Sequence, residues 1–195
     1  MFPLNLPNVL TVLRMVAVPV IVVALLDETP NGDALAAAVF TLAAITDGLD
    51  GYIARRRQQV TTFGKLMDPL ADKLLVVAAL VALVSLDRLA AWVAMVIIAR
   101  ELAVTGLRTI AAEQGVVIAA SWLGKVKTAL QVAAIIALIV WDPAPLAVDL
   151  LVYAAVAMTV VSGADYFFGL RRRMAESAAA KSEQVVRSGG APKRA

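Results

Sequence analysis

The chain has 195 residues, of which 61% are hydrophobic and 17% are charged, with a net charge of +3 and a mean hydropathy of +0.83. Soluble domains are about 45–50% apolar, so this composition excludes an ordinary soluble domain and predicts an all-α, polytopic membrane protein. Cysteine and histidine are both absent, which excludes disulfides, thiolate nucleophiles, thiolate or imidazole zinc sites and histidine general bases. Any metal must therefore be bound by oxygen, and any general base must be a carboxylate or a lysine.

Six apolar segments follow one another along the chain, and a helix that spans a bilayer takes about 20 residues. We expect spans at 9–26, 34–54, 69–86, from 89 onward, at 126–141 and at 146–170. Arg14 interrupts the first span, so we expect its side chain to reach the membrane face. The polar stretch 55–65 and short turns separate the spans. Pro69 suits the first position of the third helix, and Asp68 before it suits the capping position.

The positions of lysine and arginine predict the orientation in the membrane. Six spans place both termini on one side, and 17 of the 18 basic residues fall on that side, with Arg88 alone on the other. Basic residues are retained in the cytoplasm, so we predict that both termini are cytoplasmic. We expect residues 1–170 to form one membrane domain. The polar, basic residues 171–195 are expected to be a disordered cytoplasmic tail.

Four aspartates stand in two pairs near the cytoplasmic ends of the second and third spans. Asp47 and Asp50 are three residues apart, and Asp68 and Asp72 are four apart, so each pair shares a helix face. Counting back from Arg55 places Asp47 about 12 Å below the loop, within reach of lipid phosphates. Ionised carboxylates at that depth are costly unless a cation or another partner compensates them.

Oxygen ligands favour Mg²⁺ or Mn²⁺, and four carboxylates suit two ions better than one. Such metal pairs recur in phosphoryl chemistry. Gly51 and Ala54 lie on the face of the first aspartate pair and are small enough for a bulky ligand to approach the backbone, while Arg55 can bind a phosphate or form a salt bridge. Asp68 could instead be a helix cap, Gly51 and Ala54 could serve helix packing, and Arg55 could follow the positive-inside bias. No structural requirement explains the first aspartate pair.

This stretch resembles the signature of the CDP-alcohol phosphatidyltransferases. Their pattern is D-x-x-D-G-x-x-A-R, eight residues and G-x-x-x-D-x-x-x-D, and the chain matches it at Asp47, Asp50, Gly51, Ala54, Arg55, Gly64, Asp68 and Asp72. The resemblance implies a six-helix membrane fold, usually dimeric, in which the four aspartates hold two metals. It also implies a CDP site shaped by Gly51, Ala54, Arg55 and Gly64. Asp72 would be the general base for an acceptor hydroxyl that attacks the lipid-side phosphorus and releases CMP without a covalent enzyme intermediate.

Three further stretches resemble the bacterial phosphatidylglycerophosphate synthases of this family. They are residues 5–14, residues 99–102 with 107–108, and residues 121–128, and they extend the resemblance to residue 166. In the first stretch Asn8, Thr11 and Arg14 are candidates for contacts with the donor, although Arg14 could also follow the positive-inside bias.

Four cations within or beside the fourth and fifth spans indicate an anionic acceptor. Arg100 and Arg108 are eight residues apart and lie near one helix face, and Lys125 and Lys127 add charge at the start of the fifth span. Cations inside a span need anions, and an acceptor that carries a phosphate would supply one. Glu101 or the aspartates could also supply the counter-charge, and Lys127 could follow the positive-inside bias.

We therefore expect transfer of the phosphatidyl group from CDP-diacylglycerol to sn-glycerol 3-phosphate, giving phosphatidylglycerophosphate and CMP. The expected setting is a homodimer in the bacterial inner membrane, with its active site facing the cytoplasm and no nucleic-acid partner. Inositol phosphate as the acceptor is the alternative within the family, and divalent-cation transport is the alternative from another class. Against transport, the acids cluster at one depth instead of lining a pore.

Overall fold

The computed structural model describes residues 6–27, 30–57, 62–113 and 121–189, and every regular element in these ranges is a helix. Side chains are described in these ranges except at 6–8, 47–57, 62–69 and 176–189. The helices are α1 (Leu6–Leu26), α2 (Gly32–Arg57), α3 (Thr62–Ser85), α4 (Ala91–Glu113), α5 (Trp122–Val140) and α6 (Leu146–Gly189). The all-α prediction is confirmed for the described residues.

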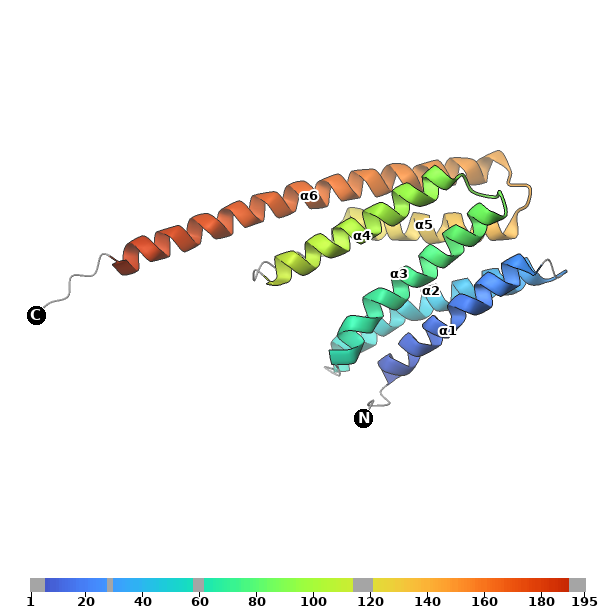
Figure 1. The fold of residues 1–195 in the computed structure, drawn as a ribbon, viewed down its shortest axis with the longest axis horizontal. Helices are drawn as coiled ribbons and strands as arrows, with labels where there is room; N and C mark the ends of the chain where they lie inside the picture. The colour runs from blue at the N-terminus through green and yellow to red at the C-terminus, as the bar shows by residue number, and fades with distance from the viewer. Residues whose placement is uncertain (1–5, 28–29, 58–61, 114–120, 190–195) are drawn as a thin grey trace, which may run out of the picture.

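The helices form two neighbouring groups. In one group α1 packs against both α2 and α3, and in the other α6 packs against α4 and α5. Contacts of α2 with α5 and of α3 with α4 join the groups into one bundle, from which the end of α6 projects (Figure 1). As a result, segments far apart in the sequence meet where the two groups touch.

Small and aliphatic side chains fill the space between the helices. Ala36 and Phe40 of α2, Leu83 of α3, and Ile135 and Ile139 of α5 are among the most deeply buried residues. Alanines at such contacts let helix backbones approach closely, as in membrane bundles. Large apolar side chains also cover much of the outer surface, where water would be an unfavourable environment.

Among the described residues, three segments are long and apolar enough to cross a bilayer: Val9–Leu26, Trp122–Val140 and Leu146–Ala175. A shorter apolar helical stretch covers Gly32–Thr46. These segments and the apolar outer surface support a membrane protein. The count of six spans and the cytoplasmic orientation of the termini stay predictions.

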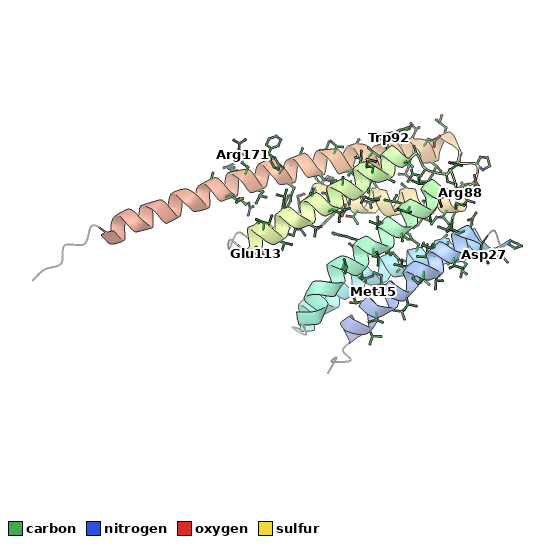
Figure 2. All side chains as sticks on the ribbon, in the orientation of Figure 1. Met15, Asp27, Arg88, Trp92, Glu113 and Arg171 are labelled. Atoms are coloured by element: carbon green, nitrogen blue, oxygen red, sulfur yellow. The ribbon has the colours of Figure 1, made fainter. Side chains whose placement is uncertain are left out.

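Arg88 connects three turns at one end of the bundle. Asp27 lies at the same end, whereas Glu113 and Arg171 lie toward the other end (Figure 2). Nη1 of Arg88 lies 2.9 Å from Oδ1 of Asp33, and its Nε lies 3.0 Å from Oδ2 of Asp142. The hydrogen bond to Asp33 raises the pKa of the Arg88 guanidinium above its usual value, and the charge of Asp142 adds to this. The basic residue predicted to stand alone on the non-cytoplasmic side is thus paired with local acids.

The third helix begins earlier than predicted. α3 starts at Thr62, so Pro69 lies inside the helix and Asp68 is not at its capping position. Capping preferences contribute only about 1 kcal/mol, so by themselves they do not fix where a helix begins. α2 likewise continues through Arg57, so most of the stretch 55–65 predicted as a loop is helical, and residues 58–61 lie outside the described part.

The sixth helix extends beyond the predicted end of its span at Leu170 and continues to Gly189. The added sequence is rich in alanine, glutamate, lysine and arginine, which are strong helix formers even without burial. The polar composition of this segment is therefore compatible with an exposed helix as well as with a disordered tail. The division into a domain at 1–170 and a tail at 171–195 stays a prediction.

Candidate functional site

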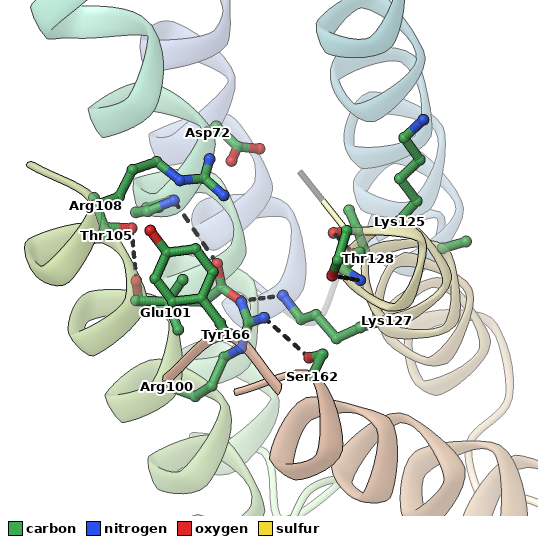
Figure 3. Close-up of a pocket in the computed structure, with 15 residues that line it drawn as sticks. Asp72, Arg100, Glu101, Thr105, Arg108, Lys125, Lys127, Thr128, Ser162 and Tyr166 are labelled. Carbon is green, nitrogen blue, oxygen red and sulfur yellow. Dashed lines mark hydrogen bonds and ion pairs between the residues drawn. The ribbon is translucent and has the colours of Figure 1, made fainter. Parts of the chain in front are cut away.

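A cavity of about 500 Å³ lies between α3, α4, α5 and α6 (Figure 3). The charged side chains that line it are Asp72, Lys73, Arg100, Glu101, Arg108, Lys125 and Lys127. Among the described side chains, five cations thus stand against two carboxylates, an excess of three positive charges. Part of the wall lies in apolar spans, where uncompensated charge is costly. An anion in the cavity would compensate this excess.

The carboxylate of Glu101 joins cations from three helices. Its Oε1 accepts a hydrogen bond from Nη1 of Arg100 at 3.2 Å and also pairs with Nζ of Lys127. Its Oε2 lies 3.7 Å from Nζ of Lys73. Glu101 therefore supplies counter-charge to Arg100 and Lys127, which is one of the explanations left open by the sequence.

Arg100 is held between α4 and α6. Its Nη2 donates a hydrogen bond of 2.9 Å to Oγ of Ser162, and that hydroxyl donates to the carbonyl of Thr159 at 3.2 Å. A Cβ on Gly163 would lie only 3.2 Å from Cγ of Arg100, so the glycine leaves room for the arginine stem. These contacts fix the guanidinium in the cavity wall.

Arg108 has a different environment from Arg100. Its guanidinium carbon lies 5.6 Å from the centre of the Tyr166 ring, a cation–π distance. Within the described part of the chain, neither Arg108 nor Lys125 forms an ion pair with a carboxylate. These two cations are therefore the ones in the cavity wall that lack a counter-ion from described side chains.

The start of α5 places its two lysines differently. Ser121 caps the helix by accepting a hydrogen bond from the Gly124 amide at 3.2 Å, so α5 begins before the predicted residue 126. Lys125 is exposed at the rim of the cavity, whereas Lys127 is only 3% exposed and faces Glu101. All four cations predicted to bind the acceptor thus line one cavity. Arg100 and Lys127 are paired there with Glu101.

Asp72 is the one signature aspartate whose side chain is described. It lines the main cavity and also a smaller cavity of about 70 Å³ that reaches Phe40 and Gln131. Among described side chains no group of three metal-binding residues occurs. The side chains predicted for the metal and CDP sites lie otherwise outside the described ones: Asp47, Asp50, Gly51, Ala54, Arg55, Gly64 and Asp68. The donor set, four carboxylates in a chain without histidine or cysteine, fits hard divalent ions.

The residues predicted to contact the donor lie on α1. The side chain of Asn8 is outside those described, and Thr11 is buried. Arg14 is only 3% exposed and lines a cavity of about 290 Å³ between α1 and α2, so its side chain packs inside the bundle, and its position at the membrane face stays a prediction. The packing of α1 against α2 and α3 covers this face of the helix, which hydropathy along α1 could not indicate.

Sequence reasoning assigned no role to Lys73, Ser162 or Tyr166, although all three line the main cavity. Lys73 follows a signature aspartate, and this position was an available signal. Ser162 and Tyr166 lie in an apolar span and become informative only because α6 packs against α4.

Comparisons with known proteins bear on this site. The family model described as CDP-alcohol phosphatidyltransferase matches residues 4–161. A Bacillus subtilis protein named CDP-diacylglycerol–glycerol-3-phosphate 3-phosphatidyltransferase is 45% identical over 180 residues, covering 84% of this chain and 93% of that protein. Proteins of the same name from Rickettsia bellii and Sodalis glossinidius are each 38% identical, covering 84% and 89% of this chain and 93% and 98% of their own lengths.

Proposed function

The chain belongs to the CDP-alcohol phosphatidyltransferase family, and from this premise we propose that it transfers the phosphatidyl group of CDP-diacylglycerol to sn-glycerol 3-phosphate. The products are phosphatidylglycerophosphate and CMP. The names of the relatives support this reaction, because they share 38–45% identity with the chain over most of its length. Family membership argues against cation transport.

The observation that carries the acceptor assignment is the excess of positive charge among the described side chains of the main cavity. Glu101 neutralises only part of it, and Arg108 and Lys125 have no carboxylate partner among the described side chains. A phosphate is a strong partner for such cations. We therefore assign the acceptor phosphate to Arg108 and Lys125 directly, with Arg100 and Lys127 behind them, and a neutral alcohol would leave this charge unused.

Asp72 is the proposed general base. It lines the cavity that holds the cations, so an acceptor bound there by its phosphate can present a hydroxyl to this carboxylate. As Asp72 takes the proton, the hydroxyl oxygen forms a bond to the lipid-side phosphorus, and the bond from that phosphorus to CMP breaks.

Four aspartates are the proposed ligands of two divalent ions, Mg²⁺ or Mn²⁺: Asp47, Asp50, Asp68 and Asp72. Bound metals would neutralise phosphate oxygens of the donor while CMP departs. Gly51, Ala54, Arg55 and Gly64 are the proposed CDP contacts, and Asn8, Thr11 and Arg14 are proposed on the donor side. The family signature between residues 47 and 72 supports the metal and CDP assignments, and the family model, which matches residues 4–161, covers the three donor-side positions.

The proposed setting is the bacterial inner membrane, with six spans, both termini and the active site on the cytoplasmic side, and a homodimeric assembly. The distribution of basic residues supports the orientation. A cytoplasmic site would also be accessible to a water-soluble phosphorylated alcohol such as glycerol 3-phosphate.

CMP release tests this function directly. Purified protein in detergent with CDP-diacylglycerol and Mg²⁺ should release CMP when glycerol 3-phosphate is added, and a chelator should abolish the release until Mg²⁺ or Mn²⁺ is restored. Preferred use of inositol phosphate would replace the proposed acceptor. No CMP release with any phosphorylated alcohol would contradict the proposed reaction.

A further inference from the structure

Tyr166 of α6 contacts α4 and forms part of the wall of the main cavity. Only 7% of the residue is exposed, and it packs in a small apolar cluster with Val104, Ala111 and Leu170. Its ring lies beside the guanidinium of Arg108. The ring therefore has a structural role that is already satisfied.

The hydroxyl of Tyr166, in contrast to its ring, lacks a partner among the described residues. It is buried and has no hydrogen-bond partner in the described part of the protein. Buried tyrosine hydroxyls usually find a partner, because an unpaired one loses its bonds to water without replacement. Figure 3 shows the hydroxyl end of the ring directed toward Thr105 and Arg108, on the side of the cavity where Asp72 also lies.

The groups around this hydroxyl indicate what its partner is. Nε of Arg100, in the same cavity wall, is also buried without a hydrogen-bond partner, so two unpaired donors line one cavity. The guanidinium of Arg108 can only donate, and no bond from it to the hydroxyl forms. Phosphate oxygens only accept, so a phosphate in this cavity is a suitable partner for the hydroxyl of Tyr166.

We propose that the Tyr166 hydroxyl donates a hydrogen bond to the phosphate group of the acceptor, while the Tyr166 ring holds Arg108 beside the same group. The identity of the acceptor rests on the proposed function, whereas the recognition of a phosphate by this hydroxyl does not. Tyr166 is thus an acceptor-binding residue, and the hydroxyl and the ring have separable contributions.

Tyr166→Phe tests the hydroxyl, because it removes one oxygen and keeps the ring beside Arg108. The matched control is Tyr153→Phe, the same change on the same helix at an exposed tyrosine that stacks on Trp92. Calorimetric titration of the full-length protein in detergent with glycerol 3-phosphate and with inorganic phosphate measures binding without turnover. Thermal unfolding of both variants checks that the fold is retained.

We expect Tyr166→Phe to weaken binding of both probes by about tenfold or more, the usual loss for a hydrogen bond to a charged group. The KM for glycerol 3-phosphate should rise by a similar factor, with kcat and the KM for CDP-diacylglycerol close to those of the unmodified protein. Tyr153→Phe should change none of these values.

Three outcomes would overturn the inference. The first is unchanged binding of inorganic phosphate by Tyr166→Phe when Tyr166→Leu weakens it, because the ring alone would then act. The second is a fall in kcat with unchanged binding, and the third is no saturable phosphate binding by the unmodified protein. If that protein binds phosphate but transfers nothing to glycerol 3-phosphate, the proposed function fails, while the effect of Tyr166→Phe on phosphate binding still decides the inference.

Discussion

At the scale of single residues, Glu101 partly neutralises the positive charge in the cavity wall. Cations from three helices meet at this carboxylate, and without it Lys73, Arg100 and Lys127 would repel one another in surroundings that screen charge poorly. Because Glu101 carries one negative charge against three cations, this group of four side chains keeps a net positive charge. The arrangement holds the cations together before an acceptor arrives.

Asp72→Asn should separate proton transfer from donor binding. The amide keeps the size of the carboxylate and loses its basicity, so we expect CMP release to fall by about 100-fold or more. Binding of CDP-diacylglycerol, measured by titration in detergent, should be partly retained. Glu113→Gln, a change of an exposed carboxylate at the end of α4, serves as the control and should leave turnover unchanged. Full activity of Asp72→Asn would show that another group is the base.

At the scale of elements, α6 contributes Ser162 and Tyr166 to the wall of the cavity. Ser162 and Tyr166 are four residues apart and share one helix face, which packs against α4 and carries contacts to Arg100 and Arg108. Gly163 beside them allows the close approach of Arg100. A span that is apolar in composition thus positions two of the cations.

Gly163→Ala should disturb the acceptor site through Arg100. The new methyl group would lie 3.2 Å from Cγ of Arg100, so the arginine stem must shift and its bond to Ser162 should weaken. We expect a higher KM for glycerol 3-phosphate with little change in the KM for CDP-diacylglycerol. Gly169→Ala is the matched control, because a Cβ there meets no atom within 4 Å. Equal effects of the two variants would argue against a specific contact.

Arg88→Gln should lower stability and leave the chemistry intact, because Arg88 joins the α3–α4 turn to Asp33 and Asp142 at one end of the bundle. Both acids are partly exposed, so we expect a loss of about 1 kcal/mol. For a chain of this length that corresponds to a Tm lower by about 2–4 °C, measurable by thermal unfolding in detergent. Arg173→Gln, at an exposed position on α6, should not change the Tm. An unchanged Tm for Arg88→Gln would mean that the turns hold without it.

At the scale of the whole molecule, the apolar outer surface and the distribution of charge place the protein in a membrane. The large exposed side chains on the helices are mostly aliphatic, and the cavity with its cations lies between the two helix groups. The Arg88 cluster lies toward one end of the bundle, and the projecting end of α6 with Arg171 lies toward the other (Figures 1 and 2). The predicted orientation puts the end with Arg171 in the cytoplasm and the end with Arg88 on the other side of the membrane.

Single cysteines can test this orientation without background, because the chain contains no cysteine. Pro30→Cys lies in the exposed turn before α2, and Ala175→Cys is exposed on α6. A membrane-impermeant maleimide should label Pro30→Cys in intact bacterial cells and Ala175→Cys only after the cells are opened. The reverse pattern would invert the predicted topology, and labelling of both positions in intact cells would contradict six spans.

Properties that depend on neighbouring residues were accessible from the amino-acid sequence by itself. Hydropathy predicted an all-helical membrane protein, and the spacing of the aspartates between 47 and 72 indicated the family, because periodicity places such residues on one helix face. Helix ends were predicted less well. A capping preference of about 1 kcal/mol does not fix where α3 begins, and polar helix formers continue α6 beyond Leu170.

Only the tertiary structure decided how the cations are used. Glu101 pairs with Lys73 and Lys127, which lie on two other helices. Arg100 of α4 donates a hydrogen bond to Ser162 of α6. All these pairs depend on how the helices pack. The burial of Arg14 under neighbouring helices and the unpaired hydroxyl of Tyr166 have the same origin. The sequence alone thus determined the donor chemistry and the family, while helix packing decided which cations, and which tyrosine, remain available to an acceptor phosphate.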